Sequence, residues 1–219
     1  MYPNILNRIR GWNKLDVKPG TEPLNGVEVH KLERGHSYLV KEPKPRFSFE
    51  IFTSLIKSKC PQCDHPGAFP CESIGCEQCS LNCPCKDCNY TRAQGLCFTM
   101  YSPKEVRQRY TLQTTPIFWI SSCGSEHIEP ADLGMMANII RVFFKESKNP
   151  VVMLDGIEYL TVINGLTSIL KFLHDIQEWV IEYNTIFVLP ISPLAFEKKE
   201  LALIERNMDE IHTLNNAND

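Results

Sequence analysis

The chain has 219 residues, of which 43% are hydrophobic, so it is long enough to bury a core and too apolar for a disordered protein. Its formal net charge of -3, with acids and bases mixed along the sequence, disfavours nucleic acid as a partner, because a phosphate-binding surface needs an excess of bases. No apolar run approaches the roughly 20 residues that span a bilayer, and charges stand where a signal peptide needs an apolar stretch, so we expect a cytoplasmic protein with no transmembrane segment.

Residues 1–26 are predicted to form an arm or linker, in which a segment rich in proline and glycine follows a short amphipathic stretch (Tyr2, Ile5, Leu6, Ile9). We interpret the amphipathic stretch as a docking helix. The basic residues beside Trp12 leave a second interpretation open, an arm that binds a partner or a membrane surface (Arg8, Arg10, Lys14).

Short apolar strands alternate with helices from residue 27 onward. Two short strands surround Arg34-Gly35, and Ser102-Pro103 supplies a cap and a first-turn proline for a short helix through Arg109. The other helices show apolar residues at helical spacing. The predicted strands are 27–35, 36–41, 96–101, 115–122, 151–155 and 184–191, and the other predicted helices are 44–58, 131–147, 165–183 and 197–211.

This alternation predicts an α/β fold, with a mostly parallel sheet that helices cover on both faces. We predict one α/β core domain over residues 27–212, which carries a cysteine-rich insertion at residues 59–94, and a polar tail over residues 213–219.

Eight of the ten cysteines lie between residues 60 and 88, where ordinary apolar residues are too few to offset the entropy of ordering the segment. Three Cys-x2-Cys pairs have the spacing at which a tight turn directs two thiolates at one ion. Eight such ligands fit two tetrahedral zinc sites of four cysteines each, with no open position for a substrate, which is typical of structural zinc. The predicted metal ligands are Cys60, Cys63, Cys71, Cys76, Cys79, Cys83, Cys85 and Cys88.

The identity of the metal has an alternative. The run from Cys76 to Pro84 matches the last three ligands of the bacterial ferredoxin pattern, whose first ligand would fall at Ser73, so an iron-sulfur cluster would need another cysteine. His65 could replace one cysteine, and the pairing of the eight stays open. Acids balance the bases in the insertion, so protein contact is favoured over nucleic-acid contact.

The two remaining cysteines lie outside the insertion. We interpret Cys97, within a predicted strand, as a small core residue. Cys123, near His127, is interpreted as an ordinary cysteine close to a strand end, with a reactive thiol as the alternative.

The stretches GHSYLVKEPKP, GLCFTMYSPKEVRQRY, TPIFWIS and DLGMMANIIRVFFKESKNPVVMLDGIEYL, continuing through LALIERNMDEI, resemble the archaeal domain-of-unknown-function family 835. The resemblance covers about residues 27–212, and the cysteine-rich stretch departs from it as an added insert. Members of that family also occur attached to sensor and histidine-kinase-like modules, so the resemblance implies signal transduction.

The order of the elements also resembles a RecA- or KaiC-type ATPase core. That resemblance implies that Asp155, at the end of VVMLD, would hold Mg²⁺ through water and that the loop after SYLV would hold phosphates. The loop is KEPKPRFSFE, which has no glycine and no Gly-Lys-Ser/Thr, so the core is predicted to be a degenerate P-loop fold without ATP hydrolysis.

Three residues are candidate ligand-binding groups: Lys44, Asp155 and Glu158. Asp155 and Glu158 would form a polar rim at the carboxyl end of a strand, where open α/β sheets bind ligands. Alternatively, Lys44 is simply exposed to solvent and Asp155 caps the backbone that follows it. A small-molecule or nucleotide ligand has no further support in the sequence, and no catalytic residue is assigned.

The sequence therefore predicts a non-enzymatic regulatory or adaptor domain, in which a zinc-stabilised knob contacts a protein partner. The alternative is an iron-sulfur redox sensor, or an enzyme with an atypical nucleotide site.

Overall fold

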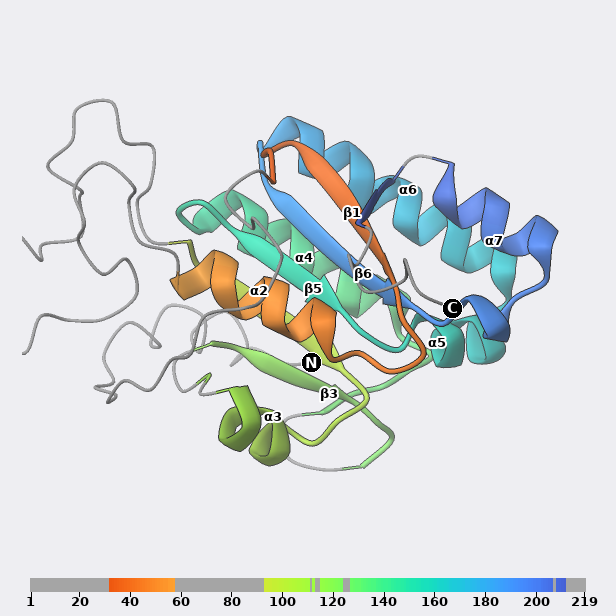
Figure 1. Cartoon of the computed structure of the whole chain (residues 1–219), viewed down its shortest axis with the longest axis horizontal. Coiled ribbons are helices and arrows are strands. Elements are labelled where there is room, and N and C mark those ends of the chain that lie inside the picture. Colours follow the sequence, from red (N-terminus) through yellow and green to blue (C-terminus); the bar gives the residue numbers. More distant parts are fainter. Residues whose placement is uncertain are drawn as a thin grey trace, which may run out of the picture.

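The protein, seen here as a computed structural model, is described over residues 32–57, 93–110, 112, 115–123, 127–206 and 208–211. Its centre is a seven-stranded sheet in the order β4-β3-β2-β5-β6-β1-β7, and every neighbouring pair is parallel (Figure 1). The predicted α/β fold with a parallel sheet is therefore confirmed.

The strands are β1 (His36–Lys41), β2 (Gly95–Thr99), β3 (Ile117–Ile120), β4 (His127–Ile128), β5 (Val151–Leu154), β6 (Ile186–Ile191) and β7 (Asp209–Ile211). The helices are α2 (Phe47–Lys57), α3 (Pro103–Tyr110), α4 (Leu133–Glu146), α5 (Ile157–Asn164), α6 (Leu166–Glu182) and α7 (Lys198–Glu205), with a short 3-10 helix, η3 (Pro193–Ala195), after β6.

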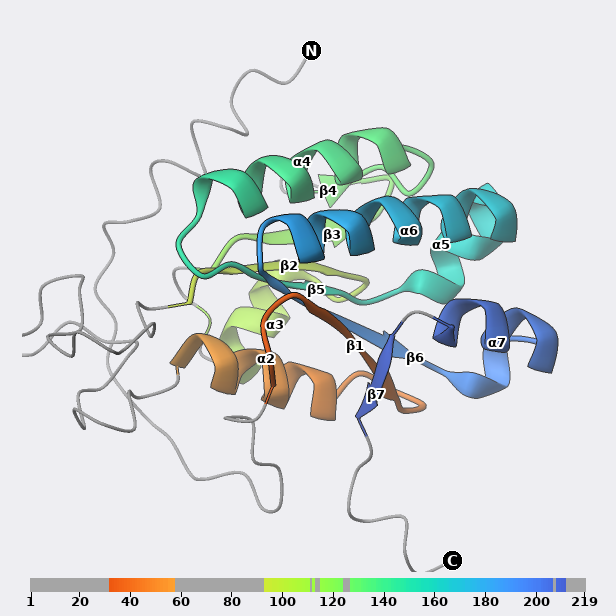
Figure 2. The same ribbon diagram turned by 90° about the horizontal axis from the view of Figure 1, so that it is seen from above.

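Helices cover both faces of the sheet, with α2 and α3 on one side and α4 and α6 on the other (Figure 2). Successive residues of a strand point to opposite faces, so β5 contributes Val151 and Met153 to the cluster under α2 and Val152 and Leu154 to the cluster under α6. All residues of β2, β5 and β6 are buried, which explains their continuous apolar sequences.

The last predicted helix, residues 197–211, is wrong in its second half. Helix α7 ends at Glu205, and residues 209–211 form β7, which pairs in parallel with β1 at the edge of the sheet. Lys41 Nζ lies 2.8 Å from Glu210 Oε2, and His36 Nδ1 lies 2.6 Å from Asp209 Oδ2. The apolar spacing of residues 197–211 also fits a helix. The contacts with β1 favour a strand for residues 209–211.

Three elements are absent from the sequence-based prediction: helix α5, the two-residue strand β4 and the 3-10 helix η3. Helix α5 has buried apolar residues, Ile157 and Leu160, but also exposed ones, so it lacks the polar face by which a surface helix is recognised. The predicted arm (1–26), most of the first predicted strand, the insertion between residues 59 and 92, and the tail (213–219) lie outside the described residues.

Candidate functional site

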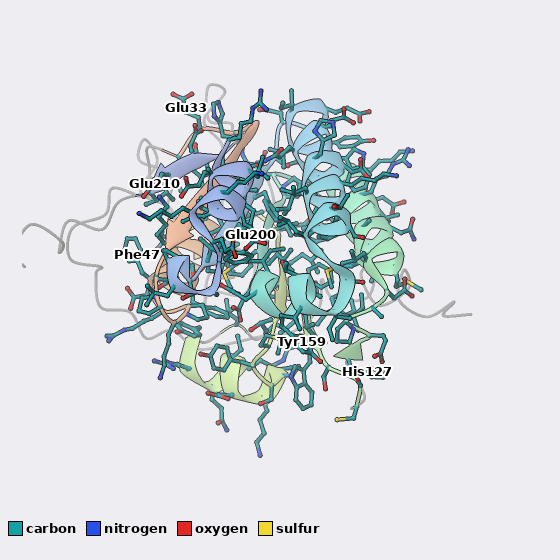
Figure 3. The ribbon with its side chains drawn as sticks, turned by 90° about the vertical axis from the view of Figure 1, so that its right-hand side faces the viewer. Glu33, Phe47, His127, Tyr159, Glu200 and Glu210 are labelled. Carbon is teal, nitrogen blue, oxygen red and sulfur yellow. The ribbon has the colours of Figure 1, made fainter. Side chains whose placement is uncertain are left out.

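The candidate site lies where the chain connections change direction, between β2 and β5. The chain leaves β2 toward β3 on one side, whereas it leaves β5 toward β6 on the other. Open α/β sheets bind ligands beyond the carboxyl ends of the strands at such a switch point. Figure 3 faces this carboxyl edge, with α5 lying across it and Phe47, at the start of α2, on the same side.

Asp155 follows β5 directly and is only 6% exposed. Its Oδ2 accepts hydrogen bonds from the Thr99 hydroxyl at 2.7 Å and from the Met100 backbone N–H at 3.3 Å, both at the end of β2. The carboxylate thus joins the two strands that flank the switch point. This arrangement differs from the turn in which Asp155 would cap the following backbone, since α5 begins after Gly156 without a side-chain cap.

Burial raises the pKa of Asp155 from its ordinary 3.8 to about 6. The hydrogen bonds from Thr99 and Met100 oppose this rise, and repulsion from Glu158 and Glu42 adds to it. Two carboxylates, one directly after β1 and one in α5, therefore act on Asp155 at this edge.

Met100 covers the start of α5. Gly156 has a φ of +101°, and a Cβ atom there would lie 2.6 Å from Met100 Cγ, so only glycine fits beneath this side chain. The Met100 carbonyl accepts a hydrogen bond from Trp119 Nε1 at 3.0 Å, which fixes the loop after β2. Met100 itself is 39% exposed and forms the outer surface of the switch point.

The start of α2 holds a second buried carboxylate, Glu42, which comes directly after β1 and is 9% exposed. It accepts three backbone hydrogen bonds, from Arg46 N at 2.9 Å, Phe47 N at 2.8 Å and Ser48 N at 3.0 Å. A helix N-terminus that faces the carboxyl end of a strand is an anion-binding position. In this protein the anion is the chain's own carboxylate.

The other two candidate ligand-binding residues differ in their surroundings. Glu158 is partly buried, and its Oε1 accepts a hydrogen bond from Ser192 N at 2.6 Å, so it fixes α5 to the end of β6. Lys44 is exposed in the loop between β1 and α2. The structure brings Asp155 and Glu158 to one edge with Glu42. Sequence reasoning missed Glu42, Thr99 and Met100, although Glu42 stands directly after a strand and shortly before a helix.

All eight predicted metal ligands lie outside the described residues, as does His65. Within the ranges that the structure describes, no group of three or more His, Cys, Asp or Glu could hold a metal ion.

Cys97 is buried, as expected for a core residue. Burial raises the pKa of its thiol well above the ordinary value, and the nearby Asp155 adds to this rise. Cys123 is exposed. Among the described helices, none is long and apolar enough to cross a membrane.

The raised pKa of Asp155 predicts how stability depends on pH. The folded state binds the Asp155 proton more tightly than the unfolded state, so this residue destabilises the fold increasingly as the pH rises from about 4 through 6. Asp155→Asn removes the charge. The free energy of unfolding of the variant minus that of the unmodified protein should increase by about 2 kcal/mol between pH 4.5 and 7.5. Urea denaturation of both proteins at the two pH values measures this increase, and an advantage that is constant with pH would contradict it.

Comparison with known proteins gives one family. A family model described as "Protein of unknown function (DUF835)" matches residues 85–208, from the end of the cysteine-rich run to the residues just before β7. The match covers more than half of the chain and includes the switch point, whereas β1, Glu42 and α2 precede it. No curated protein matches the chain.

Proposed function

Since the chain belongs to the DUF835 family, whose function is unknown, we propose from its own residues that it is a non-enzymatic regulatory or adaptor domain with a zinc-stabilised knob for protein contacts. In this proposal the parallel sheet is a scaffold that resembles a degenerate RecA- or KaiC-type core. The cysteine-rich insertion is the part that meets a protein partner, and the partner belongs to a signalling pathway.

The observation that carries the proposal is the position of Glu42. In a nucleotide-binding core, the helix that follows the first strand directs its free N–H groups at phosphate. Here the three N–H groups of Arg46, Phe47 and Ser48 already donate to the Glu42 carboxylate. A phosphate at this position would have to displace a buried carboxylate and would be repelled by it. Because Glu42 occupies the start of α2, the core is better suited to be a scaffold than a nucleotide-binding domain.

The anchors of the insertion support its separate role. Helix α2 ends at Lys57 and β2 begins at Gly95, and both of these ends lie at the amino edge of the sheet (Figure 1). The switch point with Asp155 lies at the opposite, carboxyl edge. The two chain ends that lead into the insertion thus lie at an edge that the candidate ligand site does not use. An all-cysteine ligand set is typical of structural zinc rather than of a catalytic metal.

A second candidate function rests on two other observations. The ferredoxin-like spacing from Cys76 to Pro84 favours an iron-sulfur redox sensor. The buried Asp155, with its pKa of about 6 at a switch point, is typical of functional groups and favours an enzyme with an atypical nucleotide site.

Assays with Mg²⁺ and ATP separate the scaffold from the enzyme. We expect the purified chain to show no ATP turnover above buffer and no saturable heat of ATP binding. Asp155→Ala tests the switch point, and Glu178→Ala is the control, because Glu178 is an exposed acid on α6 that pairs with His174. Steady turnover that disappears in Asp155→Ala but persists in Glu178→Ala would overturn the proposal.

A further inference from the structure

Helix α5 carries an apolar surface at the carboxyl edge of the sheet. Its side chains Val162, Ile163 and Tyr159 are 81%, 46% and 36% exposed. Leu194 in η3 is 93% exposed, and the hydrogen bond from Ser192 N to Glu158 places its loop beside the start of α5. We call these four residues the α5 surface. Figure 3 shows α5 and Tyr159 on the outside of this edge. Contiguous exposed apolar residues of this kind mark interaction sites.

Acidic residues lie in the chain segments next to the α5 surface. Asn164, at the end of α5, donates a hydrogen bond to the Pro130 carbonyl at 2.9 Å, so the loop before α4 borders the helix at that end. Segments 127–138, 155–170 and 192–197 frame the surface and contain no lysine or arginine. The first bases beyond them along the chain are Arg141, Lys171 and Lys198. The exposed or partly exposed acids of the three segments are Glu129, Asp132, Glu158 and Glu197.

The chemistry of the surface therefore fits an apolar helix that carries positive charge. Residues 1–15 have this composition, with apolar Tyr2, Ile5, Leu6 and Ile9 at helical spacing, three bases and no acid (Arg8, Arg10, Lys14). We propose that the α5 surface binds this segment of the same chain. The proposal goes beyond the adaptor function, because it concerns the edge opposite the anchors of the insertion.

The intervening chain is long enough for this contact. Arg34 donates hydrogen bonds to the carbonyls of Asn149 and Pro150, directly before β5, so the described chain enters at the amino edge of the sheet. A strand of six residues spans about 20 Å. Residues 16–31 can extend to about 50 Å, which is more than twice the length of such a strand.

Limited trypsin cleavage of the full chain tests the contact. Docking should slow cleavage after Arg8, Arg10 and Lys14, because proteolysis follows the population of the open form. In the double variant Val162→Gln/Ile163→Gln, which removes apolar contact without adding charge, we expect cleavage at these three sites to be about tenfold faster. The matched control is Ile181→Gln, because Ile181 is 71% exposed near the end of α6 and lies outside the α5 surface. The control should cleave at the rate of the unmodified chain.

Three further measurements make the result decisive. Circular dichroism should show the same melting temperature for the double variant and the control, which excludes a general loosening of the fold. Trypsin should also cleave the variant Arg8→Gln/Arg10→Gln faster after Lys14, the one site of the three that it keeps. The variant removes positive charge from the segment. Equal cleavage rates in the unmodified chain and the double variant would overturn the proposal. Protection that disappears on dilution would also overturn it, since it would assign the occupant to a second copy of the chain.

Discussion

Replacing Glu42 with alanine should lower the free energy of unfolding by about 2–3 kcal/mol at neutral pH. The substitution leaves the N–H groups of Arg46, Phe47 and Ser48 without their acceptor at the start of α2. It also removes a negative charge that the positive end of the helix dipole stabilises. Part of the loss is recovered, because Asp155 no longer experiences repulsion from Glu42. Urea denaturation followed by circular dichroism measures the change.

The matched control is Glu50→Ala, which removes the acid in the first turn of α2. Glu50 Oε1 lies 3.5 Å from Arg46 Nε, and the Arg46 side chain is 76% exposed, so its loss should cost no more than about 0.5 kcal/mol. Glu42→Gln retains one acceptor oxygen and should fall between the two. If Glu42→Ala and Glu50→Ala destabilised the fold equally, the carboxylate cap would not carry the energy assigned to it.

The sheet could be predicted from the sequence because its central strands are buried on both faces. In a run such as VVML, the residues that point to either face of the sheet are all apolar. This pattern between two helices predicts a strand that is buried on both faces. Residues 209–211 lack this constraint. They form a strand by pairing with β1, and their two exposed acids, Glu210 and Asp209, contact Lys41 and His36 on that strand. Such pairing depends on tertiary structure that local spacing does not encode.

The candidate site was predictable in part for the same reason. Asp155 ends a strand with a clear apolar pattern, so its place at the carboxyl edge follows from the sequence. Thr99 became its partner only through the pairing of β2 with β5, which the order of the elements along the chain does not specify. Glu42 gives no comparable signal, because lysines are the residues expected to bind phosphate in the loop after a first strand. The folded chain instead uses the acid to satisfy the N–H groups of α2.

Removal of the metal is expected to have the largest effect on the free energy of folding. The effect should be confined to the insertion. We expect the anaerobically purified chain to be colourless and to carry about two zinc ions, as eight cysteine ligands allow. A structural zinc contributes about 10 kcal/mol or more to the folding of its own segment. The α/β core has a source of stability of its own, since large apolar clusters on both faces of its sheet are built mainly from the residues of its helices and strands.

Elemental mass spectrometry and hydrogen exchange on the full chain check this expectation. A strong chelator should remove both ions and raise amide exchange across residues 60–88, while peptides from β5 and α6 keep their protection. Cys79→Ser should lose about one zinc ion, because it removes one of four ligands from one site. Cys123→Ala should keep both ions, since Cys123 is an exposed cysteine outside the run.

Two outcomes would contradict this expectation. A brown protein that contains iron and sulfide would show that the insertion binds an iron-sulfur cluster instead of zinc. Loss of protection in β5 and α6 on chelation would show that the insertion and the core fold as one unit, because buried strands exchange only when the core itself opens.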